Sequence, residues 1–173
     1  MNRRVFTFIY IALVVASSVY FAISTVNYLQ FYPALQTVSA HPETQQILND
    51  SQSSPAHVLL ELKIANPTGY SGLRIEYVVV HLFFTATDNN SIFENFPLLG
   101  SNSTRVPLGP GTSVNLRIIL PLAGNQSNLL SGFMNKYGAS VVSSYNVEIH
   151  LFTFLDALAP DLEVVRDVEY TGG

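Results

Sequence analysis

The chain lacks cysteine and tryptophan altogether, and it has few charges. Without cysteine, neither a disulfide framework nor a thiolate metal site nor a cysteine nucleophile is possible. Small secreted animal and plant domains more often carry disulfides, so this lack favours a prokaryotic surface protein, and an archaeal one in particular. Only 12% of the 173 residues are charged, and none of them lies between Val5 and Pro42.

Positive charge is scarcer than negative charge. After Arg3 and Arg4 the chain carries six basic and twelve acidic residues, which gives a net charge of about −6 with histidine counted as neutral. Nucleic-acid-binding surfaces are basic. We therefore expect no nucleic-acid partner.

The uncharged stretch begins with a long apolar run from Val5 to Leu29, VFTFIYIALVVASSVYFAISTVNYL. A helix of about 20 apolar residues crosses the roughly 30 Å of hydrocarbon in a bilayer. The run therefore predicts a transmembrane helix and interface over residues 5–32, with the lipid bilayer as partner. Pro33 is expected to end or kink this helix.

The flanking charges predict the orientation of the helix. The next basic residue after Arg4 is Lys63, so the positive-inside rule keeps residues 1–4 in the cytoplasm and places the C-terminal domain outside the cell membrane. The residues expected to anchor the span are Arg3 and Arg4 on the inner side and Tyr28, Phe31 and Tyr32 in an outer aromatic belt.

A cleaved secretory signal is the competing interpretation of the N-terminus. Arg3-Arg4, the apolar residues 5–15 and the small residues 16–18 imitate its three parts. The apolar character resumes over residues 19–35, which extends well past a normal h-region of about 7–15 residues. A mature N-terminus at residues 17–19 would identify a cleaved signal.

The rest of the chain divides into a stalk and one domain. Residues 33–55 are rich in Ser, Gln, Asn and Pro with little periodicity, which indicates a linker. Residues 56–173 are enough for one hydrophobic core and too few for two.

The domain shows β patterns. Val58–Ile64 alternates between apolar and mixed positions, and Leu73–Thr87 is apolar enough for a strand covered on both faces. A short amphipathic helix is expected at Ser127–Tyr137, with Ser127 as N-cap and Gly138 as the C-terminal stop. Further strands are expected at 92–98, 104–108, 114–120, 141–155 and 162–170. Many short strands separated by turn residues predict a mainly β, two-sheet sandwich with one short helix.

Two turns carry a family resemblance. The strand and turn KIANPTG contains Asn66 and Pro67, and VPLGPGTSVNLRIIL contains Gly109, Pro110 and Gly111. With the long strand LRIEYVVV between them, residues 56–170 resemble the late-embryogenesis-abundant type 2 family, also called the WHy (water stress and hypersensitive response) domain. The resemblance implies an immunoglobulin- or fibronectin-like sandwich without known enzyme chemistry, and a stress-protective or surface role. Members with one N-terminal span are familiar in that family.

The sequence contains candidate modification and metal-binding residues. The glycan acceptor pattern N-x-S/T, which would make the chain a glycoprotein, occurs at Asn49, Asn89, Asn102 and Asn125. If the strands bearing His81 and His150 paired, their imidazoles could meet on a metal, but no ligand spacing such as His-x-His supports this. The acidic residues Asp156, Asp161, Glu163, Asp167 and Glu169 match no calcium-loop signature and fit a solvated strand face.

No catalytic motif is present, so we expect neither an enzyme nor a cofactor nor a metal. Two non-enzymatic functions remain. The first is a membrane-anchored extracytoplasmic module with an interaction, structural or stress-protective role, and with a protein partner or self-association at the surface. The second is a subunit of a pilus-like filament or of a membrane complex, assembled through the N-terminal helix. Ala12/Ala16 and Ser18/Ala22 have the spacing of packed small residues, although such pairs are common in spans.

Overall fold

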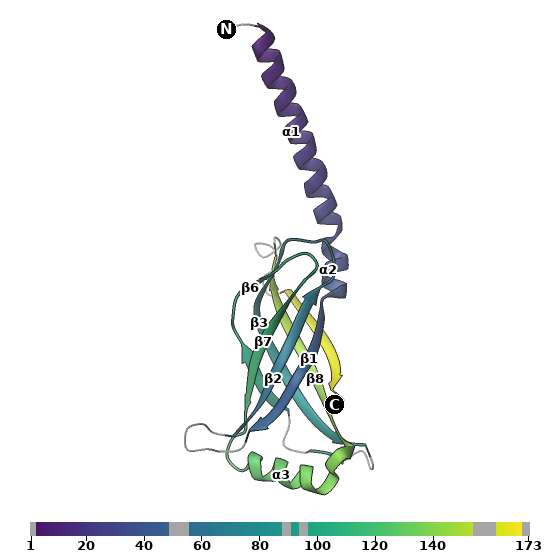
Figure 1. The fold of residues 1–173 in the computed structure, drawn as a ribbon, viewed down its shortest axis with the longest axis vertical. Helices are drawn as coiled ribbons and strands as arrows, with labels where there is room; N and C mark the ends of the chain where they lie inside the picture. The colour runs from purple at the N-terminus through teal and green to yellow at the C-terminus, as the bar shows by residue number, and fades with distance from the viewer. Residues whose placement is uncertain (1–2, 49–55, 88–90, 94–96, 154–161, 171–173) are drawn as a thin grey trace.

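A long helix projects from one end of a β-sandwich (Figure 1). The computed structural model describes residues 3–48, 56–87, 91–93, 97–153 and 162–170. The elements in chain order are α1 (Arg3–Leu29), α2 (Phe31–Thr37), β1 (Ser39–Leu48), β2 (His57–Asn66), β3 (Leu73–Ala86), β4 (Ser91–Ile92), β5 (Leu98–Asn102), β6 (Val106–Leu108), β7 (Thr112–Pro121), α3 (Gln126–Tyr137), the 3₁₀ turn η1 (Gly138–Ser140), β8 (Val141–Phe152) and β9 (Leu162–Tyr170).

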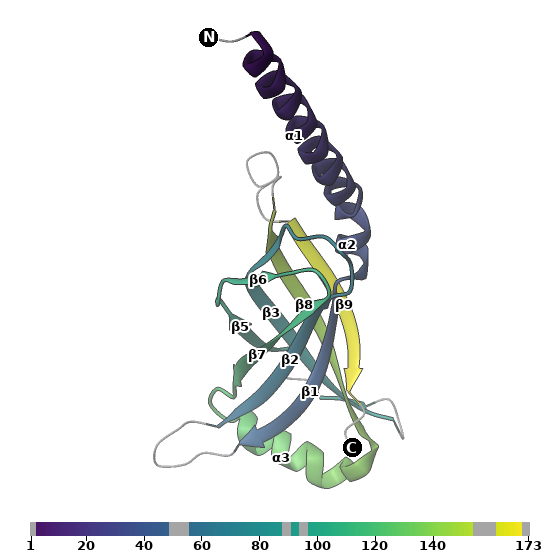
Figure 2. The same cartoon turned by 45° about the horizontal axis from the view of Figure 1, so that its top comes forward.

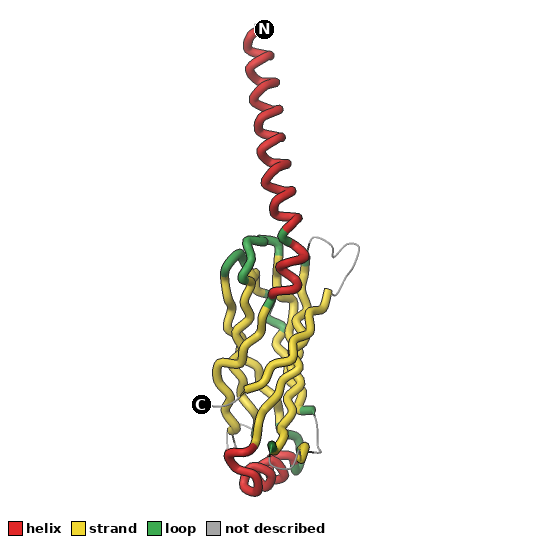
Figure 3. The backbone as a smooth tube through the Cα atoms, turned by 90° about the vertical axis from the view of Figure 1, so that its right-hand side faces the viewer, coloured by secondary structure: helices red, strands yellow, loops and turns green. Residues whose placement is uncertain are grey.

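Helix α1 stands clear of the sandwich along most of its length (Figure 3). Its large apolar side chains are exposed, as at Phe8 (75%) and Phe21 (72%). Among the described residues, the stretch Arg4–Thr37 is the one helical segment long and apolar enough to cross a membrane. The predicted apolar helix is therefore present.

The helix breaks at Gln30, three residues before Pro33. A proline has no N–H to donate and its ring clashes with the carbonyl of residue i−4, which is Leu29 here. The interruption consequently falls at Gln30, whose amide bonds back to the carbonyl of Asn27 at 3.1 Å. Pro33 itself sits in the first turn of α2, where its fixed φ is tolerated.

Two antiparallel sheets face each other. One has the strand order β1-β2-β7, and the larger has β3 at its centre, paired with β8 and then β9 on one side and with β4, β5 and β6 in succession on the other (Figure 2). The predicted mainly β sandwich is confirmed. The alternation in β2 directs Val58, Leu60, Leu62 and Ile64 into the core, where each is at most 1% exposed.

The sheets approach each other closely along both edges. On one side Gly100 of β5 meets β7: a Cβ there would lie 2.9 Å from the carbonyl oxygen of Ile119. The amide of Asn102 donates to the carbonyl of Arg117 at 2.8 Å across the same edge. On the other side β1 lies beside β9.

Helix α3 closes the end of the sandwich that lies far from α1 (Figure 1). It buries Leu130 and stops at Gly138, whose φ of 54° suits glycine, so the predicted C-terminal stop is confirmed. The predicted N-cap is wrong, because Asn125 and not Ser127 precedes the first turn. The side-chain oxygen of Asn125 accepts from Asn128 at 3.1 Å, and the Oε1 of Gln126 accepts from the amide of Ala123 at 2.8 Å.

The expected linker over residues 33–55 is wrong for most of its described part. Ser39–Leu48 forms strand β1, which pairs with β2 from Ser39↔Ala65 to Leu48↔His57. The register shifts between Pro42 and Thr44, which disrupts the alternation that would have indicated a strand. Residues 49–55 lie outside the described part. Strand bounds also shift at 92–98, where the structure describes β4 and β5, the latter beginning only at Leu98.

Candidate functional site at the junction of helix and sandwich

The junction is built on the buried side chain of Asn66, the last residue of β2. Its Nδ2 donates to the carbonyl of Tyr70 at 2.9 Å and to that of Gly109 at 3.2 Å. Its Oδ1 accepts from the amide of Thr68 at 3.1 Å and from the Thr68 hydroxyl at 2.7 Å. A fully buried amide of this kind is stable only when its donors and acceptors are paired. Asn66 therefore holds the 66–70 turn in one shape.

The two turns that carried the family resemblance lie against each other. Besides the bond from Asn66 to Gly109, the amide of Gly111 donates to the carbonyl of Thr68 at 3.0 Å. Gly111 has a φ of 62°, a conformation that an L-side chain rarely adopts. Forty-three residues apart in sequence, the Asn-Pro and Gly-Pro-Gly turns form one platform under α1.

Helix α1 is bonded directly to this platform. The Oδ1 of Asn27 accepts from both the amide and the hydroxyl of Ser71, each at 3.2 Å. Beside them, a Cβ at Gly69 would lie 2.6 Å from the side-chain oxygen of Gln30. Glycine at position 69 therefore leaves room for the Gln30 side chain at the end of α1.

Helix α2 belongs to the sandwich core. Phe31 and Ala34 are at most 1% exposed, and the ring of Phe31 packs edge-on against that of Tyr70 with centroids 5.4 Å apart. Burial raises the pKa of Tyr70, because desolvation disfavours the phenolate. The predicted role of Phe31 in an outer aromatic belt is wrong: the break at Gln30 turns its ring into the core.

Arg166 of β9 fastens the other end of α2. Its Nη2 donates to the carbonyls of Leu35 and Gln36, both at 2.9 Å, and its Nε donates to that of Val38 at 2.7 Å. The last carbonyls of a helix lack intrahelical partners and carry partial negative charge, so a guanidinium is well suited to them. We refer to the Asn27–Ser71 and Arg166–α2 hydrogen bonds together as the clamp.

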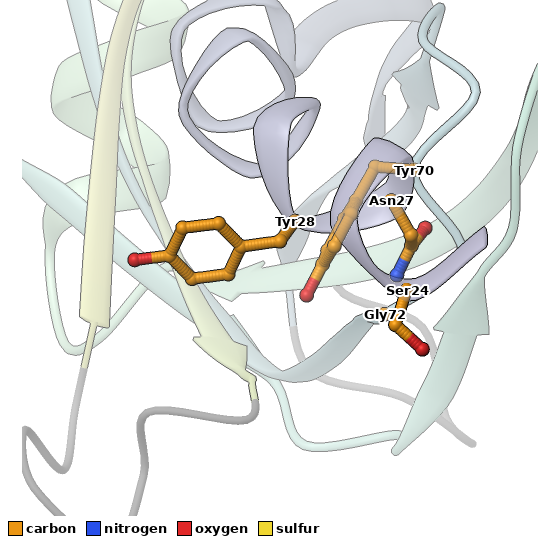
Figure 4. A pocket seen from close by; sticks show the side chains of 5 residues that line it. All are labelled: Ser24, Asn27, Tyr28, Tyr70 and Gly72. Carbon is orange, nitrogen blue, oxygen red and sulfur yellow. The ribbon is translucent and has the colours of Figure 1, made fainter. Parts of the chain in front are cut away.

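A cleft of about 290 Å³ opens where α1 meets the platform. It is lined by Ser24, Asn27, Tyr28, Tyr70 and Gly72. Figure 4 shows Asn27 and Tyr70 next to each other, while the Tyr28 ring extends away from Asn27. Its lining is uncharged, with hydroxyl and amide groups beside aromatic rings.

The chain is distantly similar to several solved structures. No family model matches the chain, and no curated protein does. Among solved structures, a protein from Archaeoglobus fulgidus is similar at 13% identity and a TM-score of 0.43, covering 79% of this chain and 98% of that one. A protein from Arabidopsis thaliana covers 76% and 83% at 12% identity and a TM-score of 0.32. A candidate late embryogenesis abundant protein covers 90% and 84% at 15% identity and a TM-score of 0.33. At these values the similarity says nothing of what this chain binds, and membership of the late-embryogenesis-abundant family stays a prediction.

The other predicted anchor residues take different positions. Tyr28 and Tyr32 are exposed, at 52% and 62%, so both are accessible where a belt would lie. Arg4 is exposed at the start of α1. The hydroxyls of Ser17 and Ser18 bond to carbonyls of their own helix, at Leu13 and Val14. Neither serine therefore needs a polar partner from another helix.

The histidine strands do pair, but the structure does not bring the imidazoles together. In the β3–β8 register, His150 lies opposite Tyr77 and His81 opposite Asn146. His150 stacks on the Tyr77 ring with centroids 3.8 Å apart, and His81 contacts a carboxylate oxygen of Glu148 at 3.2 Å. Within the described ranges, no three His, Asp or Glu side chains gather as a metal site would need.

Within the described part of the chain, the acidic residues and the candidate glycosylation sites lie on several different elements. Glu163, Asp167 and Glu169 alternate on the exposed face of β9, whereas Asp156 and Asp161 lie outside the described residues. Asn102 uses its Nδ2 to bond Arg117. Asn125 is exposed beside α3. The sequons at Asn49 and Asn89 are likewise outside the described part, so glycosylation stays a prediction.

Sequence reasoning missed the clamp. Asn27 had a signal, since it is one of the few polar side chains in an apolar run that ends at Leu29. No sequence signal marks Ser71 or Arg166, because their hydrogen-bond partners lie 44 and about 130 residues away in the chain.

Proposed function

We propose that the chain is a non-enzymatic, membrane-anchored module that holds a β-sandwich at a fixed height and orientation on the outer face of the cell membrane. Helix α1 is the anchor, with the N-terminus in the cytoplasm. The observation that carries the proposal is the clamp. A tether needs only a flexible linker, whereas here Asn27, α2 and Arg166 hold the helix and the sandwich together.

The polar residues of the junction support a structural role. Asn66 directs its amide to backbone groups and to Thr68, and Arg166 directs its guanidinium to backbone carbonyls. Their hydrogen bonds maintain the shape of the junction, which is what a module with an interaction or protective role requires.

Topology can be tested in a chain that has no cysteine of its own. Single-cysteine variants Leu129→Cys on α3 and Asn2→Cys near the N-terminus would be expressed in cells and treated with a membrane-impermeant thiol reagent. Leu129 is 43% exposed, so its variant reports access to the far end of the sandwich. We expect labelling of Leu129→Cys in intact cells and of Asn2→Cys only after the membrane is permeabilised.

Protein from the same cells distinguishes a membrane anchor from a cleaved signal and from a filament subunit. The proposal expects release by detergent and not by salt or shear, with an intact mass that includes Asn2. A chain that begins at residues 17–19 would show a cleaved signal and would contradict the anchor. Release by shear as filaments would instead assign α1 to packing between copies.

A further inference from the structure

The junction end of the sandwich lies close to the membrane surface if α1 spans it, so this inference rests on the proposed function. With Arg4 at the inner boundary, the 20 residues from Val5 to Ser24 span about 30 Å at 1.5 Å per residue. Asn27 then lies about 4–5 Å beyond the hydrocarbon, within a headgroup layer of roughly 5–7 Å. Ser71, bonded to Asn27, lies at the same depth.

Two strand ends of the large sheet lie at the α1 end of the sandwich. Strand β3 begins two residues after Ser71, and β8 runs from η1 at the far end of the sandwich to Phe152 at the α1 end (Figure 2). In the ladder between these strands, Arg74 lies directly opposite Phe152. One cationic and one aromatic side chain therefore lie side by side at the α1 end of this sheet.

Both side chains are accessible. Phe152 is 46% exposed and Arg74 is exposed. Among the described residues the Arg74 guanidinium makes no hydrogen bond or ion pair, whereas Arg105 nearby is paired with Glu76 at 3.2 Å. Glu163 lies one strand further out, opposite His150, and Asp167 and Glu169 follow towards the far end of β9. Two basic side chains, Arg74 and Arg105, thus lie towards the end of this face that would meet lipid, where Glu76 pairs with Arg105 and Glu163 begins the acidic residues of β9. Asp167 and Glu169 lie further from that end.

We propose that Arg74 and Phe152 form a second membrane contact, in which the sandwich rests on the leaflet that α1 enters. Phe152 enters the boundary between headgroups and acyl chains, where aromatic rings are favoured. The Arg74 guanidinium binds the phosphate of an anionic phospholipid, for which its planar fork of donors is suited. The clamp supplies the alignment, because it sets the angle between helix and sheet.

The test uses the absence of tryptophan. In the full chain reconstituted into nanodiscs, Phe152→Trp provides the sole tryptophan, and lipids brominated in the upper acyl chain quench fluorescence on contact. We expect at least a twofold loss of emission relative to unbrominated discs. The matched control is Leu129→Trp on α3 at the opposite end of the sandwich, for which we expect no loss. Equal, undiminished emission from both variants would overturn the proposal.

The contribution of Arg74 is measured in the same background. With Phe152→Trp present, Arg74→Gln is expected to reduce quenching in discs containing anionic phospholipid. Arg117→Gln, an exposed arginine in the middle of β7, is the control and should leave quenching unchanged. Identical quenching with and without Arg74 would remove its assignment to the phosphate.

Co-elution with the discs distinguishes failure of the anchor from failure of the second contact. A chain that co-elutes but shows no quenching of Phe152→Trp contradicts the second contact and leaves the anchor intact. A chain that fails to enter discs contradicts the anchor and the second contact together.

Discussion

At the scale of single residues, Asn66 is the side chain on which the junction most depends. Replacing it by alanine leaves the amide of Thr68 and the carbonyls of Tyr70 and Gly109 without their partner in a buried place. We expect Asn66→Ala to lower the free energy of unfolding by about 2–4 kcal/mol. Urea unfolding of the detergent-solubilised chain measures this.

The matched control for that variant is Asn115→Ala. The amide of Asn115 donates to the carboxylate of Glu43 at 3.1 Å on an exposed face. Its loss should change the free energy of unfolding by no more than about 0.5 kcal/mol. Equal effects of the two substitutions would contradict the central place of Asn66.

Alanine substitution is expected to have opposite effects on stability at two glycines. A Cβ at Gly100 would meet the Ile119 carbonyl and the side chains of Ile118 and Leu120 within 3 Å, so Gly100→Ala should destabilise the fold by about 1–3 kcal/mol. At Gly132, within α3, a Cβ would meet nothing within 4 Å, and alanine there should stabilise by about 0.5–1 kcal/mol. Thermal unfolding of both variants checks the signs.

Tyr145 predicts a loss of stability at high pH. Burial raises its pKa, and the neighbouring Tyr170 adds to the rise. A phenol whose pKa is higher in the folded than in the unfolded chain stabilises the fold fully below the ordinary value near 10, and that stabilisation is lost as pH rises above it. We expect the urea midpoint to fall as pH rises above about 10, and to fall less steeply in Tyr145→Phe. An equally steep fall in both proteins would exclude Tyr145 as the cause.

At the scale of elements, α2 depends on Arg166. Without the guanidinium, the carbonyls of Leu35, Gln36 and Val38 lose their donor. Arg166→Gln should therefore loosen α2 from β9, which hydrogen exchange would register as faster exchange at Ala34 and Val38 while the amides of the β3–β8 ladder stay protected. Unchanged exchange in α2 would show that the burial of Phe31 is sufficient to hold it.

The elements also show what sequence patterns could predict. Strands β2, β3, β7 and β9 were expected within a few residues of their bounds, because alternation or continuous apolar character marks a strand with one or two covered faces. Strand β1 was missed because its inward positions include Pro42 and Gln45 and a register shift interrupts them. Phe31 was misplaced because a continuous apolar run does not reveal which of its residues face lipid and which face protein. The meeting of Asn66 with Gly109 is a long-range contact that no local pattern specifies.

At the scale of the whole molecule, the clamp predicts a single relative orientation of helix and sandwich. Spin labels at Ile23→Cys on α1 and Leu129→Cys on α3, both exposed positions in a cysteine-free chain, would report the distance between the two ends. We expect a narrow distance distribution in nanodiscs. Adding Asn27→Ala and Arg166→Gln should broaden it.

The matched control for that experiment is the pair Asn115→Ala and Arg117→Gln, which removes the same two residue types from the outer face of the small sheet. It should leave the distribution narrow. A broad distribution in the parent chain would mean that the helix and the sandwich move independently, and the proposal of fixed orientation would then fail.

The way the helix breaks at Gln30 makes the orientation of the sandwich depend on the thickness of the bilayer. A hydrophobic segment of fixed length, Val5–Leu29, tilts more in a thin bilayer and less in a thick one. Since the Asn27–Ser71 bonds before that break and the Arg166–α2 bonds after it join the helix to the sandwich, a change in tilt of α1 becomes a swing of the whole sandwich, largest at α3. The position of α3 above the surface would then vary with the lipid composition of the leaflet below it.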